Sequence, residues 1–373
     1  MPDEAPVNTG AVRWPGPESA HCAVRGMQIK LHRWAGEDDS RRFGDLFNLV
    51  HDPAFRVHAW ERVASNTGAT TPGIDRATVA MIVTWIGVEA FSEHIRDALK
   101  TGAFEPVEVR QVMIPKANGK LRALGIPTVA DWVVQASLKA VLEPIFEADF
   151  MPCSYGFRPN RRAHDAIAEI HHLSSGARKF HWVLEADIKA CFDGIDHTAL
   201  MDRLRARIKD KRVCALVKAF LKSGVMTTSG DREETLTGTP QGGILSPLLA
   251  NIALSALDEY FARQWQKGMG SYKRRVTRRK HGLGNWRLIR FADDFVLVVS
   301  GNAAMPRTCA RRWPACSPPW GCGWHWRRPR WSTSTRASTS SASTSAGSGN
   351  EERRSTTATP SRPRRRSSRS RTR

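Results

Sequence analysis

Two adjacent carboxylates, Asp293 and Asp294, interrupt an apolar run that extends from Leu288 to Val299. β-Branched and aromatic residues on both sides of the pair predict two short strands, with Ala292-Asp293-Asp294 at the turn between them. Two carboxylates about 4 Å apart repel by roughly 4 kcal/mol at an effective dielectric constant of ~20. A divalent cation is the usual means of keeping both groups ionised. The alternative is an ordinary hairpin turn, in which Asp is common.

The positive charge of the chain is unevenly distributed. Of the formal net charge of +21, residues 301–373 contribute 16 Arg and two Glu, a net of +14. The first 300 residues therefore hold 41 Lys and Arg against 34 Asp and Glu, a net of +7. A moderately basic globular body of this kind suits a nucleic-acid partner.

The cysteines and the N-terminus indicate a cytoplasmic protein. Cys22, Cys153, Cys191 and Cys214 lie far apart and lack the paired spacing of zinc ligands. Scattered free thiols are typical of a reducing compartment. The first residues do not resemble a signal peptide, and no apolar run approaches the length of a membrane span, so we expect no membrane contact.

Apolar residues at helical spacing predict most of the remaining structure. Residues 1–42 are polar and rich in Gly and Pro, which predicts a loose lead-in that becomes helical only near 28–34. Asp131 is the predicted N-cap of one helix, and Ser246 and Pro247 are the predicted N-cap and first position of another. The other predicted helices cover 43–62 with a break at Asp52-Pro53, 78–100, 163–170 and 198–221.

A basic β-hairpin is predicted over residues 107–127. Asn118-Gly119 separates two extended apolar runs, which is a strong hairpin signal. The hairpin carries Arg110, Lys116, Lys120 and Arg122. These cations are either a clamp for phosphate oxygens or a solvated basic surface.

Two further basic stretches suit contact with nucleic acid. Residues 155–162 interleave Tyr155 and Phe157 with Arg158, Arg161 and Arg162, a composition suited to base stacking and phosphate contact. Core packing explains the two aromatic residues equally well. Residues 273–281 are predicted as a basic loop, which is either solvated or in contact with nucleic acid.

A third carboxylate and a glycine-rich loop complete a constellation that can perform chemistry. Asp187 follows a predicted strand that begins near His181, and Gln241 lies in the glycine-rich stretch 237–247. Three carboxylates from two strands can hold two Mg²⁺ ions about 4 Å apart for in-line phosphoryl transfer. In this hypothesis Lys116 and Arg122 bind the triphosphate of the substrate.

Five ordered motifs resemble those of bacterial group II intron-encoded reverse transcriptases and maturases. The resemblance covers residues 43–300. The motifs are Ile114-Pro-Lys-x-x-Gly-Lys-x-Arg, Tyr155-Gly-Phe-Arg-Pro, Asp187-Ile-Lys-x-Cys-Phe-Asp, Gly238-Thr-Pro-Gln-Gly-Gly-Ile-Leu-Ser-Pro and Phe291-Ala-Asp-Asp. The resemblance implies an α+β, right-hand polymerase fold (the reverse transcriptase fold), with an N-terminal extension and fingers over 43–180 and a palm over 181–301.

The resemblance also implies roles for individual residues. Asp187, Asp293 and Asp294 match the catalytic, Mg²⁺-binding aspartates, and Lys116 and Arg122 match the residues that contact the dNTP phosphates. Phe192 matches the aromatic gate that excludes a ribose 2′-hydroxyl, and Gln241 matches a residue beside the dNTP and the template. The alternatives are that Phe192 is a core residue, Gln241 caps a loop and Asp293 merely forms a turn.

The resemblance implies that the partners are dNTPs, a group II intron RNA template and a DNA primer or target. Phe291 stands where the family usually has Tyr, and no thumb or maturase domain is recognisable after the Asp pair. An RNA-binding splicing cofactor without polymerase activity and an inactive fragment are therefore alternatives. CRISPR-associated and diversity-generating reverse transcriptases are weaker enzyme alternatives.

Residues 302–373 cannot form a hydrophobic core. From residue 301 onward the chain contains no Leu, Ile, Val or Phe, but five Trp and 23 Ser and Thr. This composition predicts disorder. One interpretation is a basic disordered tail that binds RNA; the interpretation we favour is a GC-rich gene read out of frame.

Overall fold

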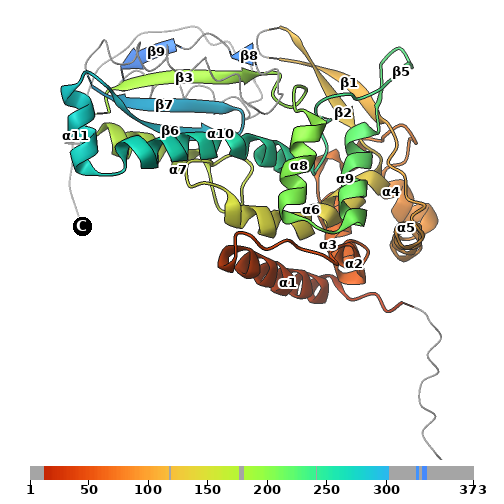
Figure 1. Ribbon diagram of the computed structural model, residues 1–373. Helices are drawn as coiled ribbons and strands as arrows, with labels where there is room; N and C mark the ends of the chain where they lie inside the picture. Colours follow the sequence, from red (N-terminus) through yellow and green to blue (C-terminus); the bar gives the residue numbers. More distant parts are fainter. Residues whose placement is uncertain are drawn as a thin grey trace, which may run out of the picture.

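The computed structural model describes residues 12–116, 119–175, 180–240 and 242–301. Within these ranges the side chains of Asp187 and Lys189 are not described. Two short strands at 325–326 and 330–333 are described by their backbone alone. Two β-sheets are joined by a layer of helices (Figure 1). The helical elements are α1 (Pro17–Glu37), α2 (Phe47–Val50), α3 (Pro53–Ala64), η1 (Thr67–Thr70), α4 (Val79–Met81), η2 (Ile82–Ile86), α5 (Val88–Thr101), α6 (Val129–Asp149), α7 (Ala163–Ser174), α8 (His197–Arg207), α9 (Lys211–Lys222), α10 (Ser246–Met269) and α11 (Tyr272–Lys280).

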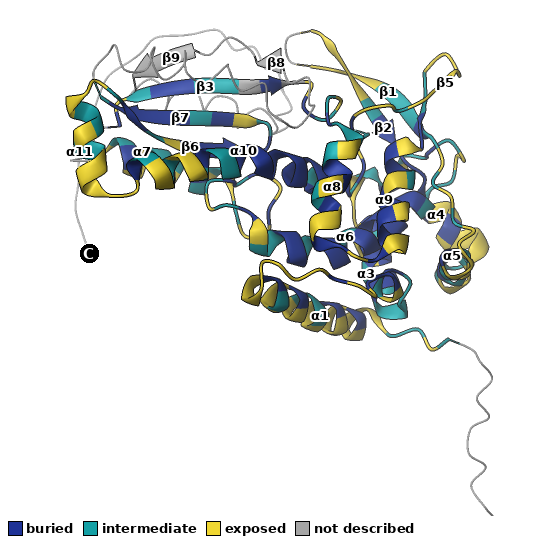
Figure 2. Cartoon of the chain, viewed as in Figure 1, coloured by how far each residue is buried: buried dark blue, intermediate teal, exposed yellow. Residues whose placement is uncertain are grey.

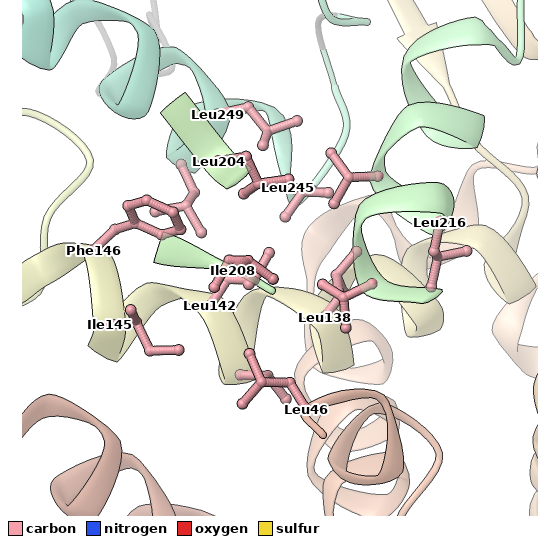
Figure 3. Packing of buried hydrophobic residues seen from close by; sticks show 14 of the residues in the cluster. Leu46, Leu138, Leu142, Ile145, Phe146, Leu204, Ile208, Leu216, Leu245 and Leu249 are labelled. Carbon is pink, nitrogen blue, oxygen red and sulfur yellow. The ribbon is translucent and has the colours of Figure 1, made fainter. Parts of the chain in front are cut away.

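Helix α6 is the centre of the main hydrophobic core. Most of its side chains are buried, because other helices pack around it on several sides. Its Leu138, Leu142 and Ile145 belong to the same cluster of buried side chains as Leu204 of α8 and Leu249 of α10 (Figure 3). Burial of a Leu or Ile side chain contributes about 1.5–3 kcal/mol. Segments far apart in the sequence are therefore tied to one helix.

The N-terminal lead-in is more ordered than predicted. Residues 17–37 form the 21-residue helix α1, which packs against α3 and α6. Val24 and Leu31 are buried in the main core, and Gln28 donates a hydrogen bond from Nε2 to the carbonyl of Ala140 at 3.0 Å. The prediction was wrong here because only a narrow apolar stripe of this mostly polar helix faces the core.

The first sheet contains the predicted hairpin. β1 (Val109–Pro115) pairs with β2 (Leu121–Ile126) in antiparallel register from Arg110↔Ile126 to Pro115↔Leu121, which confirms the prediction. The short strands β4 (Val225–Met226) and β5 (Arg232–Glu233) extend it in the order β2-β1-β4-β5. The tip of the hairpin projects from the body (Figure 1).

The second sheet carries the predicted carboxylates. β6 (Asn285–Phe291), β7 (Asp294–Ser300) and β3 (Trp182–Lys189) are adjacent and antiparallel, and β3 also pairs with β8 (His325–Trp326) and β9 (Arg330–Thr333). Helices α7 and α10 pack against the sheet through alternating buried side chains of the strands. Apart from β8 and β9, the predictions of disorder and of a changed reading frame for 302–373 lie outside the described residues.

Helix starts differ from the prediction at two positions. Thr128, not Asp131, is the N-cap of α6: its Oγ1 accepts from the amide of Asp131 at 3.1 Å and donates to Asp131 Oδ2 at 2.8 Å. This reciprocal pair resembles a capping box, in which the acidic residue stands at the third helical position. Ser246 lies inside α10, after the N-cap Leu245, and its hydroxyl donates to the carbonyl of Pro240.

Three predicted segments differ from the structure. The predicted helix over 78–100 is divided at Gly87, which has a φ of 87°. The predicted helix over 198–221 is divided at Asp210, which caps α9 and accepts the amide of Phe47 at 2.9 Å. The predicted basic loop at 273–281 forms the helix α11. The predicted break at Asp52-Pro53 is confirmed, with Asp52 as the N-cap of α3.

Candidate active site

The turn between β6 and β7 is short and tightly defined. Ala292 and Asp293 form it, and Phe291 and Asp294 pair across its base. Ala292 is buried with a φ of 58°. A positive φ at a central turn position belongs to the two-residue hairpin turns whose twist matches the flanking strands. The predicted strand–turn–strand unit is confirmed.

The strand register places the backbone of Asp187 at the same end of the sheet. Asp187 on β3 pairs directly with Asp294 on β7. Paired residues in an antiparallel ladder have Cα atoms about 4.5–5.5 Å apart. Asp294 is exposed and Asp293 half-buried at this end of the sheet. The described side chains, which do not include that of Asp187, contain no cluster of three metal-ligating groups.

A buried arginine of β6 holds the backbone of the turn in place. Arg290 on β6 is fully buried and forms a bidentate ion pair with Asp258 of α10, at 2.9 Å from Nε and 2.6 Å from Nη2. Its Nη1 donates to the carbonyl of Ala292 at 2.8 Å. Burial lowers the pKa of Arg290, the adjacent Asp258 carboxylate raises it, and the pKa lies above its ordinary value. The turn backbone is thus held by a charged group that stays ionised.

The loop after α6 docks on the same arginine. Arg290 Nη2 donates to Ser154 Oγ at 2.7 Å, and the backbone of residues 153–155 bonds to that of Arg290 on both sides. Asn251 of α10 accepts from Arg290 Nη1 and donates to the carbonyl of Gly156 at 2.9 Å. A Cβ on Gly156 would lie 2.2 Å from the amide nitrogen of Ala292. Only glycine permits this approach.

The three arginines of that loop differ in exposure and in partners. Arg158 is buried, forms an ion pair with Glu147 and donates to the carbonyls of Met151 and Ser154. Its guanidinium therefore holds the loop onto α6, and its contact with nucleic acid stays a prediction. Arg161 donates to the Pro152 carbonyl and lies 5.3 Å from the ring of Tyr155. Arg162 is exposed at the N-cap of α7.

The glycine-rich loop lies between the fingers hairpin and the palm. A Cβ on Gly242, whose φ is 118°, would lie 2.1 Å from the carbonyl oxygen of Gly125 on β2. Trp132 of α6 donates from Nε1 to the carbonyl of Gly242 at 3.3 Å. His197 contacts the Gly238 carbonyl at 2.7 Å. The predicted Gln241 lies outside the described residues.

Phe192 lies between the core and the candidate site. It is half-buried, packs partly against the main core and meets the ring of Phe157 edge to face at a centroid distance of 6.1 Å. Its carbonyl accepts the amide of Thr239 from the glycine-rich loop at 2.8 Å. Both earlier interpretations, a core residue and a substrate gate, are compatible with this position.

The basic hairpin presents its tip cations to solvent. Lys116 and Arg122 are exposed near the turn, where Lys116 and Lys120 are bonded through their backbones. Arg110, at the base of the hairpin, instead donates two hydrogen bonds to the carbonyl of Pro72, at 3.0 and 2.7 Å. The hairpin therefore divides into a structural base and a cationic tip.

A small, mostly apolar pocket with a few polar groups lies next to the glycine-rich loop. Its lining includes Asp131, Gln135, Thr239 and Ser246. Burial raises the pKa of Asp131 to about 7, although the hydroxyl of Thr128 acts in the opposite direction. Thr239 Oγ1 is buried without a hydrogen-bond partner. Polar groups in such a pocket suit an ordered water.

Sequence reasoning missed the residues that support the site: Ser154, Asn251, Asp258 and Arg290. One signal was present, because an arginine in the apolar run before the Asp pair is either exposed or paired when buried. Asn251 and Asp258 are seven residues apart, which places both on one face of a helix. Nothing in the linear sequence identified Ser154 as the third partner.

Comparisons with known proteins identify the family of this chain. Residues 114–311 match the family described as reverse transcriptase (RNA-dependent DNA polymerase). The chain is 37% identical over 296 residues to protein YkfC of Escherichia coli K12, covering 75% of this chain and 77% of that protein. It is 38% identical over 253 residues to the group II intron-encoded protein LtrA of Lactococcus lactis subsp. cremoris, covering 66% of this chain but only 40% of LtrA.

A solved structure of Candida albicans telomerase with a fragment of telomeric RNA has a TM-score of 0.42 and 13% identity, over 66% of this chain and 46% of that one. Among the described residues, no helix has the length and apolar composition needed to cross a lipid bilayer. The family match covers more than half of the chain and includes the strands that carry all three aspartates. The chain therefore belongs to the reverse transcriptase family, the RNA-dependent DNA polymerases.

Proposed function

We propose that this protein extends a DNA primer on an RNA template with dNTPs, and that it serves a group II intron in this way. The observation that carries the proposal is the register of the palm sheet, in which Asp187 pairs with Asp294 and Asp293 occupies the adjoining turn. Three carboxylates at one end of a sheet are the donor set of a nucleotidyl-transfer site. The intron association rests on the similarity to LtrA.

Divalent metal ions are general in this family, and the donor set fits them because carboxylate oxygens are the ligands that hard cations prefer. In our proposal Asp187, Asp293 and Asp294 hold two Mg²⁺ ions. When bound, the ions supply positive charge for the primer 3′-oxygen and for the triphosphate. The contribution of the chain is to fix the carboxylates, which Arg290 does by bonding the Ala292 carbonyl beside Asp293.

The substrate would lie between the palm turn and the fingers hairpin. Lys116 and Arg122, both exposed near the hairpin tip, would bind the dNTP phosphates. Phe192 would contact the sugar and disfavour a 2′-hydroxyl, and Gln241 would lie beside the base pair. The loop that carries Gln241 has restricted freedom, because Gly242 packs against the backbone of β2.

Primer extension tests this proposal. The full chain is incubated with Mg²⁺, poly(rA)/oligo(dT) and dTTP. We expect extension by the wild type and its loss in Asp293→Ala, whereas the matched variant Asp97→Ala, changed at an exposed carboxylate of α5, retains it. Extension that survives Asp293→Ala would refute the role of this carboxylate.

A further inference from the structure

The positive charge of the first 300 residues is concentrated in one stretch. Residues 261–291 contain ten Lys and Arg and no Asp or Glu. The rest of the first 300 residues holds 31 Lys and Arg against 34 Asp and Glu. The net positive charge of this part of the chain therefore arises entirely from the end of α10, from α11 and from β6.

Helix α11 lies at the end of the palm sheet away from the carboxylates (Figure 1). β6 leads from Asn285, close to α11, to Phe291 at the turn. Six strand steps of about 3.3 Å each separate the two ends by roughly 20 Å. The charge of α11 is therefore remote from the residues proposed to bind dNTPs.

Part of this charge fastens α11 to its neighbours. Arg274 Nη1 donates to the carbonyl of Lys267 at 3.0 Å, and Arg275 Nη1 donates to the carbonyl of Met269 at 2.8 Å. Both carbonyls belong to the last turn of α10, where cations cap unsatisfied oxygens. Arg275 and Arg287 also lie 5.6 and 3.9 Å from the ring centre of Trp265. These contacts hold α11 in a fixed position against the end of α10.

The remaining charge faces solvent. Lys273 and Lys280 are exposed and Arg279 is partly exposed, while Tyr272 is 73% exposed at the start of the helix (Figure 2). We call these four residues the α11 surface. Lys273 and Lys280 are seven positions apart, so they lie on one face of the helix.

We propose that the α11 surface binds the phosphodiester backbone of a nucleic acid outside the polymerase site. Clustered Lys and Arg without acidic neighbours attract polyphosphate chains, and an exposed aromatic ring among them can stack on an unpaired base. Binding to a membrane is disfavoured, because a helix that lies on a bilayer needs an apolar face and α11 has only Tyr272 and Val276. The inference deepens the proposed function, since a polymerase that copies intron RNA gains a second hold on it.

The test compares two triple variants of the full chain. Lys273→Gln/Arg279→Gln/Lys280→Gln removes the charge of the α11 surface, and Lys211→Gln/Lys218→Gln/Lys222→Gln removes three exposed charges from α9. Gln is a good helix former, so both helices are retained. Binding to an RNA hairpin and to a DNA hairpin of equal length is measured by fluorescence anisotropy between ~50 and ~200 mM salt.

We expect the α11 variant to bind more weakly and to reduce the slope of log K against log salt by about 2–3, with the α9 variant unchanged. Equal losses on both hairpins identify the phosphate backbone as the ligand; a loss on RNA alone identifies RNA as its source. An unchanged slope, or equal losses in both triple variants, would overturn the proposal.

Primer extension with a short template distinguishes this inference from the proposed function. We expect the α11 variant to extend the primer at the wild-type rate, because the changed residues are remote from the aspartates. If the wild type fails to extend the primer while the salt slope still depends on α11, the proposed polymerase function is refuted and the proposed binding by the α11 surface stands. If the wild type extends the primer but the salt slope does not depend on α11, the polymerase function stands and binding by the α11 surface is refuted.

Discussion

Arg290 is the residue on which the geometry of the Asp293 turn most depends. Its guanidinium joins Asp258, Ser154, Asn251 and the carbonyl of Ala292 without any exposure to solvent. Removal of one partner from a buried ion pair leaves an uncompensated charge, which typically costs about 3–5 kcal/mol. Replacement of both partners by apolar residues is often neutral. Stability and positioning can therefore be separated at this residue.

We expect Arg290→Met to lower the free energy of unfolding by about 3–5 kcal/mol. In Arg290→Met/Asp258→Leu most of that loss should be recovered, but kcat for primer extension should stay low because the Ala292 carbonyl still lacks its donor. Urea denaturation gives the stability, and steady-state extension gives kcat separately from KM. Recovery of kcat along with stability would assign Arg290 a purely structural role.

Asp131 gives the fold a specific dependence on pH. Its pKa is raised by burial from 3.8 to about 7 in the folded chain, so between these pH values the folded state binds more protons than the unfolded state. Stability therefore falls as the pH rises through this window. We expect Asp131→Asn to remove a decline of a few kcal/mol between pH 4 and pH 7. Denaturation midpoints of the wild type and the variant, measured at several pH values, test this expectation. Parallel plots of stability against pH for the two proteins would contradict it.

At the scale of the elements, the position of the glycine-rich loop depends on one close contact, between Gly242 and the Gly125 carbonyl of β2. Gly242→Ala would add a Cβ 2.1 Å from the Gly125 carbonyl, at a φ of 118° that L-residues rarely adopt. We expect a loss of a few kcal/mol in stability and a large loss of primer extension, since the loop must leave β2. Gly26→Ala in α1, with open space around it, should instead stabilise the helix by about 1 kcal/mol. Thermal melts compare the two.

Helix α1 is part of the core rather than a lead-in, and its packing can be tested directly. Leu31 is 2% exposed against α6, whereas Ile29 of the same helix is 61% exposed. We expect Leu31→Ala to cost about 2–5 kcal/mol, because it leaves a cavity, and Ile29→Ala to cost less than about 0.5 kcal/mol. Chemical denaturation distinguishes them. Equal, small effects would mean that α1 is not held on the core.

At the scale of the whole molecule, segments far apart in the sequence meet near the β6–β7 turn. The loop of residues 153–156 joins α6 of the fingers to β6 through Arg290, and Gly242 joins the palm loop to the fingers hairpin. These two contacts therefore hold β6 and β2 in place relative to the segments between them. We infer that a disturbance in either segment is transmitted to the site.

Local sequence was enough to predict several elements. The β1–β2 hairpin follows from Asn118-Gly119 between apolar runs, the break at Asp52-Pro53 from proline, and the β6–β7 hairpin from the alternation around Asp293. These features depend on neighbours within a few residues. Caps were less predictable: Asp131 and Ser246 are both suitable cap residues, but their neighbours Thr128 and Leu245 occupy the cap positions.

The sequence by itself determined the types of groups at the candidate site and the strands that carry them. Only the tertiary structure decided that Asp187 pairs with Asp294, that Arg158 turns inward to Glu147 and that Arg290 supports the turn. The physical reason is the separation along the chain of the residues that interact. Turns and strand periodicity are set by local sterics, whereas a buried charge takes the partner that folding brings to it, from 11 residues away for Arg158 and Glu147 to 136 for Arg290 and Ser154.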